Sequence, residues 1–516
     1  VFETDLDKQC EKVEQYTYDE IDNIIISDVS YQGFARVNNM PEKRILTNYQ
    51  YVRPDNLLYK KKPSKITTVY TRDGANSITQ TKRYAYTPQG KISLESFNSY
   101  FKRYQYNVCG LLVAESIEDS ITKKQFVYEY DTNFLHRSKT ISPTGLISTN
   151  TADVYGNTLI NTGPGNLKTY YTYDDLFRPY KIKAPDGTVS VRKAIRGGRD
   201  KQGFYVANYV ILNGNTEKSI IFNNAIHYDC LGREIRKEKV LLNGTHEHID
   251  IFYNEKGLSE KLYSYRGKVL VNSKEMYYDN KNRIIQEKIS SPVDVGKNGK
   301  TIDYVYYDPN VRRGKKVKAV ITNVSTTDSI VTTMIYNRTA LPVLKIENSD
   351  SIVYQYDSAD NLIKVRTVGY PTEDKYTDYG LRVSHFNNST GKSTYEYNNF
   401  NELVKEVDGQ GNKIEYAYDK EGRIITKTTG KNTVHYIYDA LTGWLKGIES
   451  LSHKLEYLYD NIGRVIEEKK TTLGIPMVKK YQYDNFGRLS VYTSPSGFKQ
   501  KNVYDDRFCE LVEIRD

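Results

Sequence analysis

The sequence contains no apolar run long enough to cross a membrane as a helix. A transmembrane helix needs about 20 consecutive apolar residues, and the 516 residues contain no apolar stretch of even 18. The first residues, Val1–Lys8, show neither an initiator Met nor a signal-peptide pattern. We therefore expect no membrane span, and we expect the chain to be a fragment or a processed form from which a targeting signal has been removed.

Cysteine and histidine are scarce. The four cysteines have no CxxC spacing, which argues against both a metal site and a disulfide-dense scaffold; they are Cys10, Cys109, Cys230 and Cys509. Among the seven histidines, His246 and His248 form the one close pair. On a strand they would share a face and could bind a metal, but no third ligand is apparent nearby. The sequence predicts no metal site and no cofactor.

The usual signatures of catalysis are also missing. The sequence has no G-x-S-x-G, no H-E-x-x-H and no Walker-type loop, and Gly197–Gly198 is too short to hold a phosphate. A glycosidase would need two carboxylates roughly 5 to 9 Å apart in a cleft, and the sequence singles out no such pair. We predict that the chain is not an enzyme and has no catalytic residues.

Helical periodicity never persists beyond about ten residues, whereas tyrosine is abundant, with 48 Tyr against a single Trp. Tyrosine is typical of strands, and its frequency is explained if a repeated strand supplies it. The pattern predicts an all-β chain.

One pattern recurs five times from Tyr416 to Asp505. Each copy reads Tyr-x-Tyr-Asp, then two or three residues, Gly, and usually Arg; the last copy is shortened to Val503-Tyr504-Asp505. The period of about 21 residues is typical of repeat architectures. The repeat-defining residues are Tyr416, Tyr418, Asp419, Gly422, Arg423, Tyr436, Tyr438, Asp439, Gly443, Tyr457, Tyr459, Asp460, Gly463, Arg464, Tyr481, Tyr483, Asp484, Gly487 and Arg488.

Each copy has the chemistry of a β-hairpin. Tyr-x-Tyr places both rings on one face of a strand, because side chains alternate with period two. Asp accepts hydrogen bonds from amides just downstream, and Gly takes the φ > 0 conformation that a turn requires. We expect stacked hairpins to bury their Tyr faces against one another. We also expect Arg423, Arg464 and Arg488 to reach the repeat Asp of a neighbouring unit.

These residues resemble the YD-repeat, or Rhs-repeat, family. The resemblance rests on the pattern Y-x-Y-D-x-x-G-R-L, on turns such as Ser494-Pro495-Ser496-Gly497, and on Tyr173-Asp174 through Ala184-Pro185-Asp186-Gly187. This last stretch and His227-Tyr228-Asp229 are similar to the repeat region of the B components of Tc toxins. The resemblance implies a hollow β-shell that holds a polypeptide, often a toxin.

One enzymatic feature of that family is not matched here. Many of its members have a D-P-x-G-x-x-G-like aspartyl self-cleavage motif before a variable toxin domain. The only Asp-Pro pair in this chain is Asp308–Pro309, and no matching glycines follow it. We expect neither self-cleavage nor a toxic payload within these residues.

We predict one continuous array of antiparallel β-hairpin repeats of about 21 residues, coiled into an extended curved sheet or hollow shell. Four segments differ in repeat regularity. They are 1–83, a degenerate N-terminal region; 84–175, with clear repeats; 176–345, with irregular repeats and longer loops; and 346–516, with regular repeats.

The function we predict is a non-catalytic shell segment that encapsulates, shields or presents another polypeptide, such as a toxin domain, in a secreted or cell-surface protein. The alternative is an extracellular binding module whose exposed tyrosines contact carbohydrate or a cell-surface protein. The net charge of +10 includes the basic clusters Lys60–Lys62, Arg192–Arg199 and Arg312–Lys318. They follow no common register, so we interpret them as solvated faces and expect no nucleic-acid partner.

Overall fold

The computed structural model describes most of the chain. The described residues are 2–4, 11–32, 43–52, 61–97, 100–134, 136–196, 204–211, 220–240, 245–291, 299–306, 315–323, 329–337, 339–347, 349–367, 369–484, 487–504 and 511–515. Several sequence features lie outside them, namely Cys10, Cys509, Gly197–Gly198, Asp308–Pro309 and Asp505.

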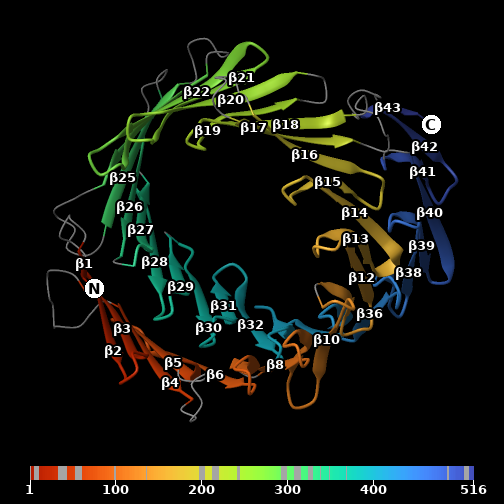
Figure 1. Ribbon diagram of the computed structural model, residues 1–516, viewed down its shortest axis with the longest axis horizontal. Coiled ribbons are helices and arrows are strands. Elements are labelled where there is room, and N and C mark those ends of the chain that lie inside the picture. Colours follow the sequence, from red (N-terminus) through yellow and green to blue (C-terminus); the bar gives the residue numbers. More distant parts are fainter. Residues whose placement is uncertain are drawn as a thin grey trace. The chain divides into compact units, whose positions relative to one another are not determined.

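The described residues form 43 strands and one short 3-10 helix, without an α-helix. Strand follows strand in chain order, and the colours of Figure 1 change gradually from each strand to the next. Contacts divide the chain into two compact units. Unit 1 comprises Val1–Val127, Asp303–Thr322 and Ser329–Lys431, and unit 2 comprises Tyr128–Ile302, Asn323–Asp328 and Asn432–Asp516.

The strands of unit 1 are β1 (Phe2–Thr4), β2 (Glu11–Tyr18), β3 (Ile24–Gln32), β4 (Lys43–Tyr51), β5 (Pro63–Arg72), β6 (Ile78–Tyr86), β7 (Ile92–Phe97), β8 (Tyr100–Tyr106), β9 (Leu112–Glu118), β26 (Ser329–Tyr336), β27 (Pro342–Glu347), β28 (Asp350–Tyr356), β29 (Leu362–Arg366), β30 (Thr372–Tyr376), β31 (Arg382–Asn387), β32 (Gly391–Tyr397), β33 (Leu403–Val407), β34 (Lys413–Tyr418) and β35 (Ile424–Thr429).

The elements of unit 2 are β11 (Arg137–Ile141), β12 (Ile147–Ala152), β13 (Thr158–Gly163), the 3-10 helix η2 (Pro164–Asn166), β14 (Leu167–Tyr173), β15 (Pro179–Lys183), β16 (Val189–Arg196), β17 (Phe204–Ile211), β18 (Ile220–Tyr228), β19 (Glu234–Val240), β20 (His246–Tyr253), β21 (Ser259–Arg266), β22 (Val269–Tyr278), β23 (Ile284–Ser290), β36 (Asn432–Tyr438), β37 (Leu445–Glu449), β38 (His453–Tyr459), β39 (Val465–Thr472), β40 (Ile475–Tyr483), β41 (Leu489–Thr493), β42 (Lys499–Tyr504) and β43 (Leu511–Arg515). β10 (Lys123–Tyr130), β24 (Lys300–Val305) and β25 (Lys315–Asn323) cross the sequence boundaries between the units.

Neighbouring strands form antiparallel hairpins. In one repeat, β34 pairs with β35 from Ile414 opposite Thr429 to Tyr418 opposite Ile424. The register shifts by one residue beside Tyr418, and the same shift recurs beside the second tyrosine of other repeats, as at Tyr459 and Tyr483. Such a shift is a β-bulge, which accompanies a hairpin turn that ends in a residue with φ > 0. The predicted all-β array of antiparallel hairpins is confirmed.

Burial is spread thinly over the sheets. Only nine hydrophobic side chains of the described residues are buried, among them Tyr128, Val191 and Met276. Both tyrosines of each regular pair are half-buried on one face of their strand, whereas the residue between them is exposed, as at Ile437 and Leu458. The prediction that the paired rings share a face is confirmed.

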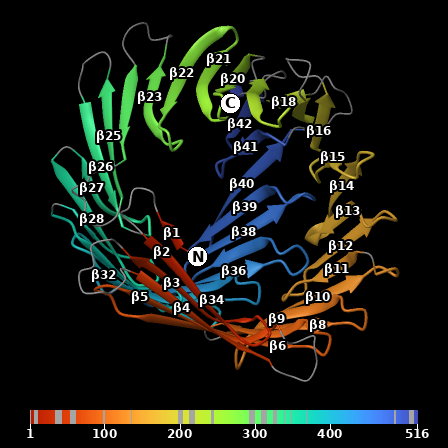
Figure 2. The same cartoon turned by 60° about the vertical axis from the view of Figure 1, so that its left-hand side comes forward.

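The four segments defined by repeat regularity remain a proposal, because they describe spacing along the chain. Units 1 and 2, in contrast, each combine stretches that lie far apart in sequence. In unit 1, strands β4 to β6 lie beside the stretch from β28 to β32 in both views of the ribbon (Figures 1 and 2), and they contact the turns after β28 and β30.

Candidate functional site: repeat turns and a polar seam

Each regular repeat turn is closed by its aspartate. The Asp419 backbone N–H donates to the Arg423 carbonyl (2.9 Å), and the Gly422 N–H donates to the Asp419 carbonyl (3.1 Å). The Asp419 carboxylate accepts from the N–H groups of Glu421 (2.8 Å) and Arg423 (3.0 Å). Gly422 has φ +83°, which explains why the repeat places glycine there.

The arginine that follows the glycine binds the aspartate of its own turn. Arg423 Nε donates to Asp419 Oδ2 (2.8 Å), and Arg464 and Arg488 bind Asp460 and Asp484 in the same way (2.6 Å each). The prediction of a contact to the aspartate of a neighbouring unit is therefore wrong. Arginine and aspartate are four residues apart across a tight hairpin, so the shortest ion pair is within the turn.

Hydrogen bonds lower the pKa of several turn aspartates. Burial raises the pKa of Asp460, but hydrogen bonds from the Arg464 backbone and side chain outweigh it and leave that pKa below its usual range. The Asn412 side chain lowers the pKa of Asp408, and the Arg178 side chain lowers that of Asp174. A depressed folded-state pKa contributes stability at neutral pH that is lost as the pH falls through the folded value, below about 3.9.

The second tyrosine of a repeat joins one hairpin to the hairpin before it. The Tyr418 hydroxyl donates to the Leu403 carbonyl (2.7 Å), and the hydroxyls of Tyr459 and Tyr483 donate to the carbonyls of Leu445 (2.6 Å) and Val465 (2.9 Å). The same bond is made by Tyr51, Tyr86, Tyr106, Tyr173, Tyr253, Tyr278, Tyr356, Tyr397 and Tyr504. The paired tyrosines therefore differ in role.

Tyr459→Phe is expected to lower the free energy of unfolding of unit 2 by about 1 kcal/mol, because it removes one hydrogen bond and leaves a carbonyl without its donor. The control is Tyr457→Phe, which removes a hydroxyl from the neighbouring ring on the same face and is expected to cost only a few tenths of a kcal/mol. Urea denaturation followed by Trp444 fluorescence measures the free energy of unfolding of both variants. Equal losses would contradict the assigned role of the Tyr459 hydroxyl.

The turn arginines also contact the next repeat through its second tyrosine. The Arg464 guanidinium carbon lies 4.5 Å from the centre of the Tyr483 ring, and that of Arg488 lies 4.4 Å from the Tyr504 ring. These are cation–π distances. The turns of Arg464 and Arg488 are thus linked forward by the arginine and backward by the second tyrosine, which makes these adjacent repeats mutually stabilising.

Burial raises the pKa of several second tyrosines, among them Tyr86, Tyr418 and Tyr459, and raises the pKa of Tyr104, a first tyrosine, to about 12. A tyrosine with a raised folded-state pKa contributes stability below the unfolded value of about 10, which is lost as the pH rises through the folded value. We expect the chain to unfold cooperatively between about pH 10 and 12. Tyrosinate absorbance at 295 nm and circular dichroism should change together; gradual ionisation without loss of strand signal would contradict this expectation.

A second arrangement joins repeats that are distant in sequence, within unit 1. Three successive repeat turns, near residues 358, 379 and 400, dock against residues 43–124. The contact is termed the seam. It consists of Lys43, Arg72, Asn76, Gln80, Thr81, Asp119 and Lys124 on one side and Ser358, Asp360, Asp378, Tyr379, Asn399, Phe400 and Glu402 on the other.

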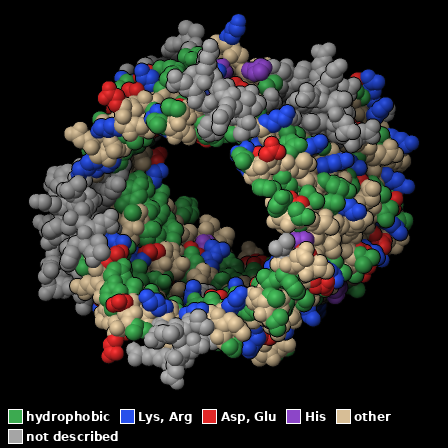
Figure 3. Space-filling model, viewed as in Figure 1, with side chains coloured by type: hydrophobic (Ala, Val, Ile, Leu, Met, Phe, Trp, Pro, Cys, Tyr) green, Lys and Arg blue, Asp and Glu red, His purple; other side chains and the backbone are tan. Residues whose placement is uncertain are grey.

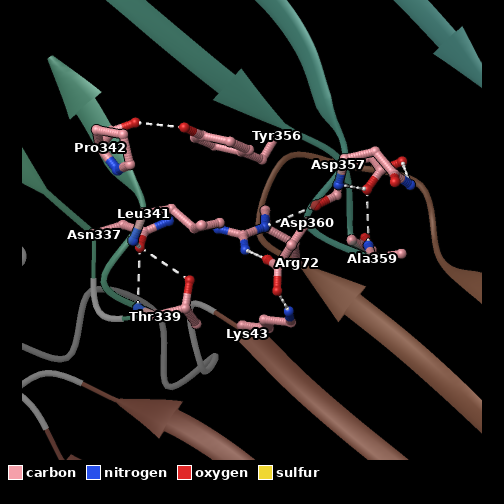
Figure 4. A network of polar contacts seen from close by, with 12 residues as sticks. Lys43, Arg72, Asn337, Thr339, Leu341, Pro342, Tyr356, Asp357, Ala359 and Asp360 are labelled. Atoms are coloured by element: carbon pink, nitrogen blue, oxygen red, sulfur yellow. Dashed lines mark hydrogen bonds and ion pairs between the residues drawn. The ribbon is translucent and has the colours of Figure 1, made fainter. Parts of the chain in front are cut away.

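The centre of the seam is an ion cluster around Asp360 (Figure 4). Lys43 from β4 and Arg72 from β5 each bind one carboxylate oxygen of Asp360. Their side chains are only 3% and 9% exposed. Arg72 Nε also donates to the Asp357 carbonyl (3.0 Å), and the fully buried Ser358 hydroxyl donates to the Asn76 carbonyl (2.7 Å). The cluster therefore fixes the turn after β28 to β4 and β5.

The next two turns dock in the same direction along the chain. Gln80 Nε2 donates to the Asp378 carbonyl (2.6 Å), and the Thr81 N–H donates to the Tyr379 hydroxyl (3.3 Å). One repeat later, Lys124 forms an ion pair with Glu402 and lies 4.6 Å from the Phe400 ring centre. The seam thus follows the chain in the same direction on both sides, from Asn76 to Lys124 on one side and from Ser358 to Glu402 on the other.

Unit 2 contains a related contact at the one tryptophan. A Cβ on Gly165 of η2 would lie 3.1 Å from Thr442 Cγ2 and 3.5 Å from Trp444 Cζ2. Trp444 takes the place of arginine in its repeat, and its ring centre lies 5.1 Å from that of Tyr459. A turn near residue 443 therefore packs on residues about 280 positions earlier in the chain.

The structure distributes the repeat-defining residues along the array rather than gathering them into one cleft. The sequence reasoning missed the seam residues. A signal existed for one of them, because Asp360 occupies the position that glycine holds in regular repeats and has φ +70°. Lys43 and Arg72 belong to no repeat motif, so no sequence pattern pointed to them.

Within the described residues, no cluster of three or more His, Cys, Asp or Glu side chains has the arrangement of a metal site. The Glu247 carboxylate pairs with Lys239 and Arg266, and the His248 ring stacks on Tyr265. Cys109 and Cys230 are exposed free thiols. The described part of the chain has no helix that is both long and apolar enough to cross a membrane.

No family model and no curated protein matches the sequence. Solved structures with a similar backbone course include those of TcdB2-TccC3-Cdc42 and TcdB2-TccC3, each 10% identical, with TM-scores of 0.43 and 0.41. They include also the Photorhabdus luminescens Tc holotoxin pore, at 10% identity and a TM-score of 0.40. The alignments cover 97 to 99% of this chain and 45% of those chains, so this chain spans less than half of their length. At these values the similarity does not assign a family.

Proposed function

We propose that this chain is a non-catalytic structural segment of a YD-repeat shell that encapsulates, shields or presents another polypeptide, such as a toxin domain. The observation that carries the proposal is the seam. It joins residues 278 to 317 positions apart, so that two distant stretches of the hairpin array support each other in unit 1. A sheet built only from sequential hairpins would leave these turns exposed.

The chemistry of the repeat also favours a structural role. The turn aspartates are engaged by backbone N–H groups and arginine, and the second tyrosine hydroxyls are engaged by backbone carbonyls. A residue required by every copy is explained by hairpin geometry, whereas an active site would need groups that converge at one place. The alternative function, a binding surface rich in tyrosine, would need exposed rings. Because the paired tyrosines are half-buried, they offer a ligand less ring area than fully exposed tyrosines would.

In this proposal the partner is a polypeptide cargo or a flanking toxin domain, and the site of action is outside the cell or at its surface. The charged side chains agree with a solvated structural protein, since Lys and Arg are interspersed with Asp and Glu on the face that Figure 3 shows. Many ion pairs of the described residues join neighbouring strands, as between Lys479 and Glu468 (2.8 Å). Membership of the YD-repeat family is part of the proposal.

The experiment is a protection assay. An unfolded reporter polypeptide is joined to the chain through a flexible linker and exposed to a protease, with the separate reporter as reference. Shielding predicts cleavage of the joined reporter at least about tenfold more slowly. The variant Asp360→Lys, which places a third cation in the seam, should abolish protection, whereas the same change at Asp22 should not. Equal cleavage of joined and separate reporter would overturn the proposal.

A further inference from the structure

Strands β17 to β22 belong to unit 2 and are adjacent in chain order (Figure 1). Their residues line a groove of about 660 Å³. The strand register sets one polar residue from each of five consecutive strands directly opposite the next. This row is Asn208, Asn224, Lys239, Glu247 and Arg266. Directly opposed residues lie on the same face of a sheet, so the row runs across the strands.

A second row lies two residues along each strand and therefore on the same face. It consists of Ile226, Lys237, Ile249, Ser264 and Asn272. Together the two rows supply ten of the fifteen described residues that line the groove. The groove thus has a polar row beside a row that contains two isoleucines and three polar residues.

The first end of the polar row presents paired amides. Asn208 Nδ2 donates to Asn224 Oδ1 (3.0 Å), and both side chains are half-buried. This bond uses one donor hydrogen of Asn208 and one lone pair of Asn224. The Asn208 oxygen and the Asn224 NH₂ group keep acceptor and donor capacity. One acceptor beside one donor is the complement of a peptide group.

The other end of the row is basic. Glu247 accepts from Arg266 Nε (2.8 Å) and pairs with Lys239 (3.1 Å), so its charge is already balanced. The side chains of Lys239 and Arg266 remain 51% and 65% exposed. Lys237 pairs outside the two rows with Glu234 (2.7 Å), so the positive excess of this face comes from Lys239 and Arg266 against the single carboxylate of Glu247. Its electrostatics favour an acidic ligand.

The groove fits an extended chain better than a sugar. Four strand spacings of about 4.8 Å make the row about 19 Å long, which is the length of about six extended residues. A sugar site would place a flat aromatic face in the row. His248 and Tyr265 also belong to the residues that line the groove, but they alternate with the two rows along β20 and β21, so their stacked rings (4.6 Å between centres) lie on the other face of the strands.

We propose that this groove binds an extended, acidic segment of polypeptide that runs across strands β17 to β21. The paired amides of Asn208 and Asn224 bind the main chain, and Lys239 and Arg266 bind acidic side chains. The inference rests on the proposed function, because a shell that holds a polypeptide supplies the ligand. To the proposed function, the inference adds where the shell contacts the polypeptide and which side chains make that contact.

The test uses the whole 516-residue chain and fluorescein-labelled octapeptides in which every second residue is Glu, Gln or Lys. Fluorescence anisotropy should give tightest binding for the Glu peptide, with a Kd that rises with salt as expected for exposed charges. Lys239→Glu and Asn224→Ala should each raise the Kd about tenfold or more, since either removes a charge-assisted or paired hydrogen bond. The matched control is Lys405→Glu, which alters a cross-strand Lys–Glu pair in unit 1.

Equal Kd values for the Glu and Lys peptides, or an equal effect of Lys239→Glu and Lys405→Glu, would overturn the inference. So would binding of acidic oligosaccharides that is stronger than that of the Glu peptide and lost in Lys239→Glu. The protection assay is independent of this groove. Reporter protection without peptide binding would reject the groove alone, whereas peptide binding without protection would reject the shielding function and leave a peptide-binding groove.

Discussion

Asp360→Asn is expected to lower the free energy of unfolding of unit 1 by about 2 kcal/mol, less than the loss of one partner of a fully buried ion pair, because the Asp360 side chain is itself 34% exposed. The substitution keeps the size of the side chain and suits the left-handed backbone at φ +70°. It removes the charge that balances Lys43 and Arg72, whose side chains are 3% and 9% exposed. Two cations would then be buried without a carboxylate.

Asp22→Asn is the matched control for this variant. Asp22 occupies the same position in the first repeat turn, has φ +60° and is exposed. Asp22→Asn should therefore change the free energy of unfolding by no more than about 0.5 kcal/mol, as for an ordinary surface substitution. Hydrogen exchange of the amides of β4, β5 and β28 localises the effect to the seam. If Asp360→Asn and Asp22→Asn changed exchange equally, the ion cluster would not stabilise the docking of this turn.

The local structure of the repeat follows from short-range chemistry, and this part could be predicted. Asp419 and Gly422 define a turn because one side chain binds nearby amides and the other residue tolerates φ > 0. Tyr416 and Tyr418 share a face because they are two residues apart on a strand. Even the error over Arg423 was local, since its partner Asp419 lies within the same turn.

The seam could not be predicted from one sequence. Lys43 and Arg72 meet Asp360 across more than 280 residues, and which repeat turn reaches which strand depends on the summed twist and bulges of every hairpin between them. Because the number of residues between successive repeats varies, counting repeats along the sequence does not show which turn lies against which strand. Aspartate in place of glycine at position 360 indicated a special turn, but it did not indicate its partners.

Gly463→Ala is expected to lower the free energy of unfolding of unit 2 by about 3 to 4 kcal/mol, from two causes that add. Alanine at φ +90° has a backbone cost of about 1 to 2 kcal/mol. The new Cβ would also lie 2.9 Å from Trp444 Cζ2, and overpacking of this kind costs about 1 to 3 kcal/mol. Trp444 has little room to move, because its ring also lies close to Gly165 and packs against Tyr459.

Gly497→Ala separates the two causes. Gly497 has nearly the same φ, +86°, but a methyl group added there would have no described atom within 4 Å, so only the backbone cost of about 1 to 2 kcal/mol is expected. In a double-mutant cycle, Trp444→Leu should reduce the cost of Gly463→Ala by about 1 kcal/mol or more, since it removes the ring that the methyl meets. Urea denaturation followed by circular dichroism serves all variants, including those without tryptophan. Gly463→Ala and Gly497→Ala could instead lower the free energy of unfolding equally, with no coupling to Trp444. In that case the tryptophan would not pack tightly against the turn, and the contact near residue 443 would add little to the stability of unit 2.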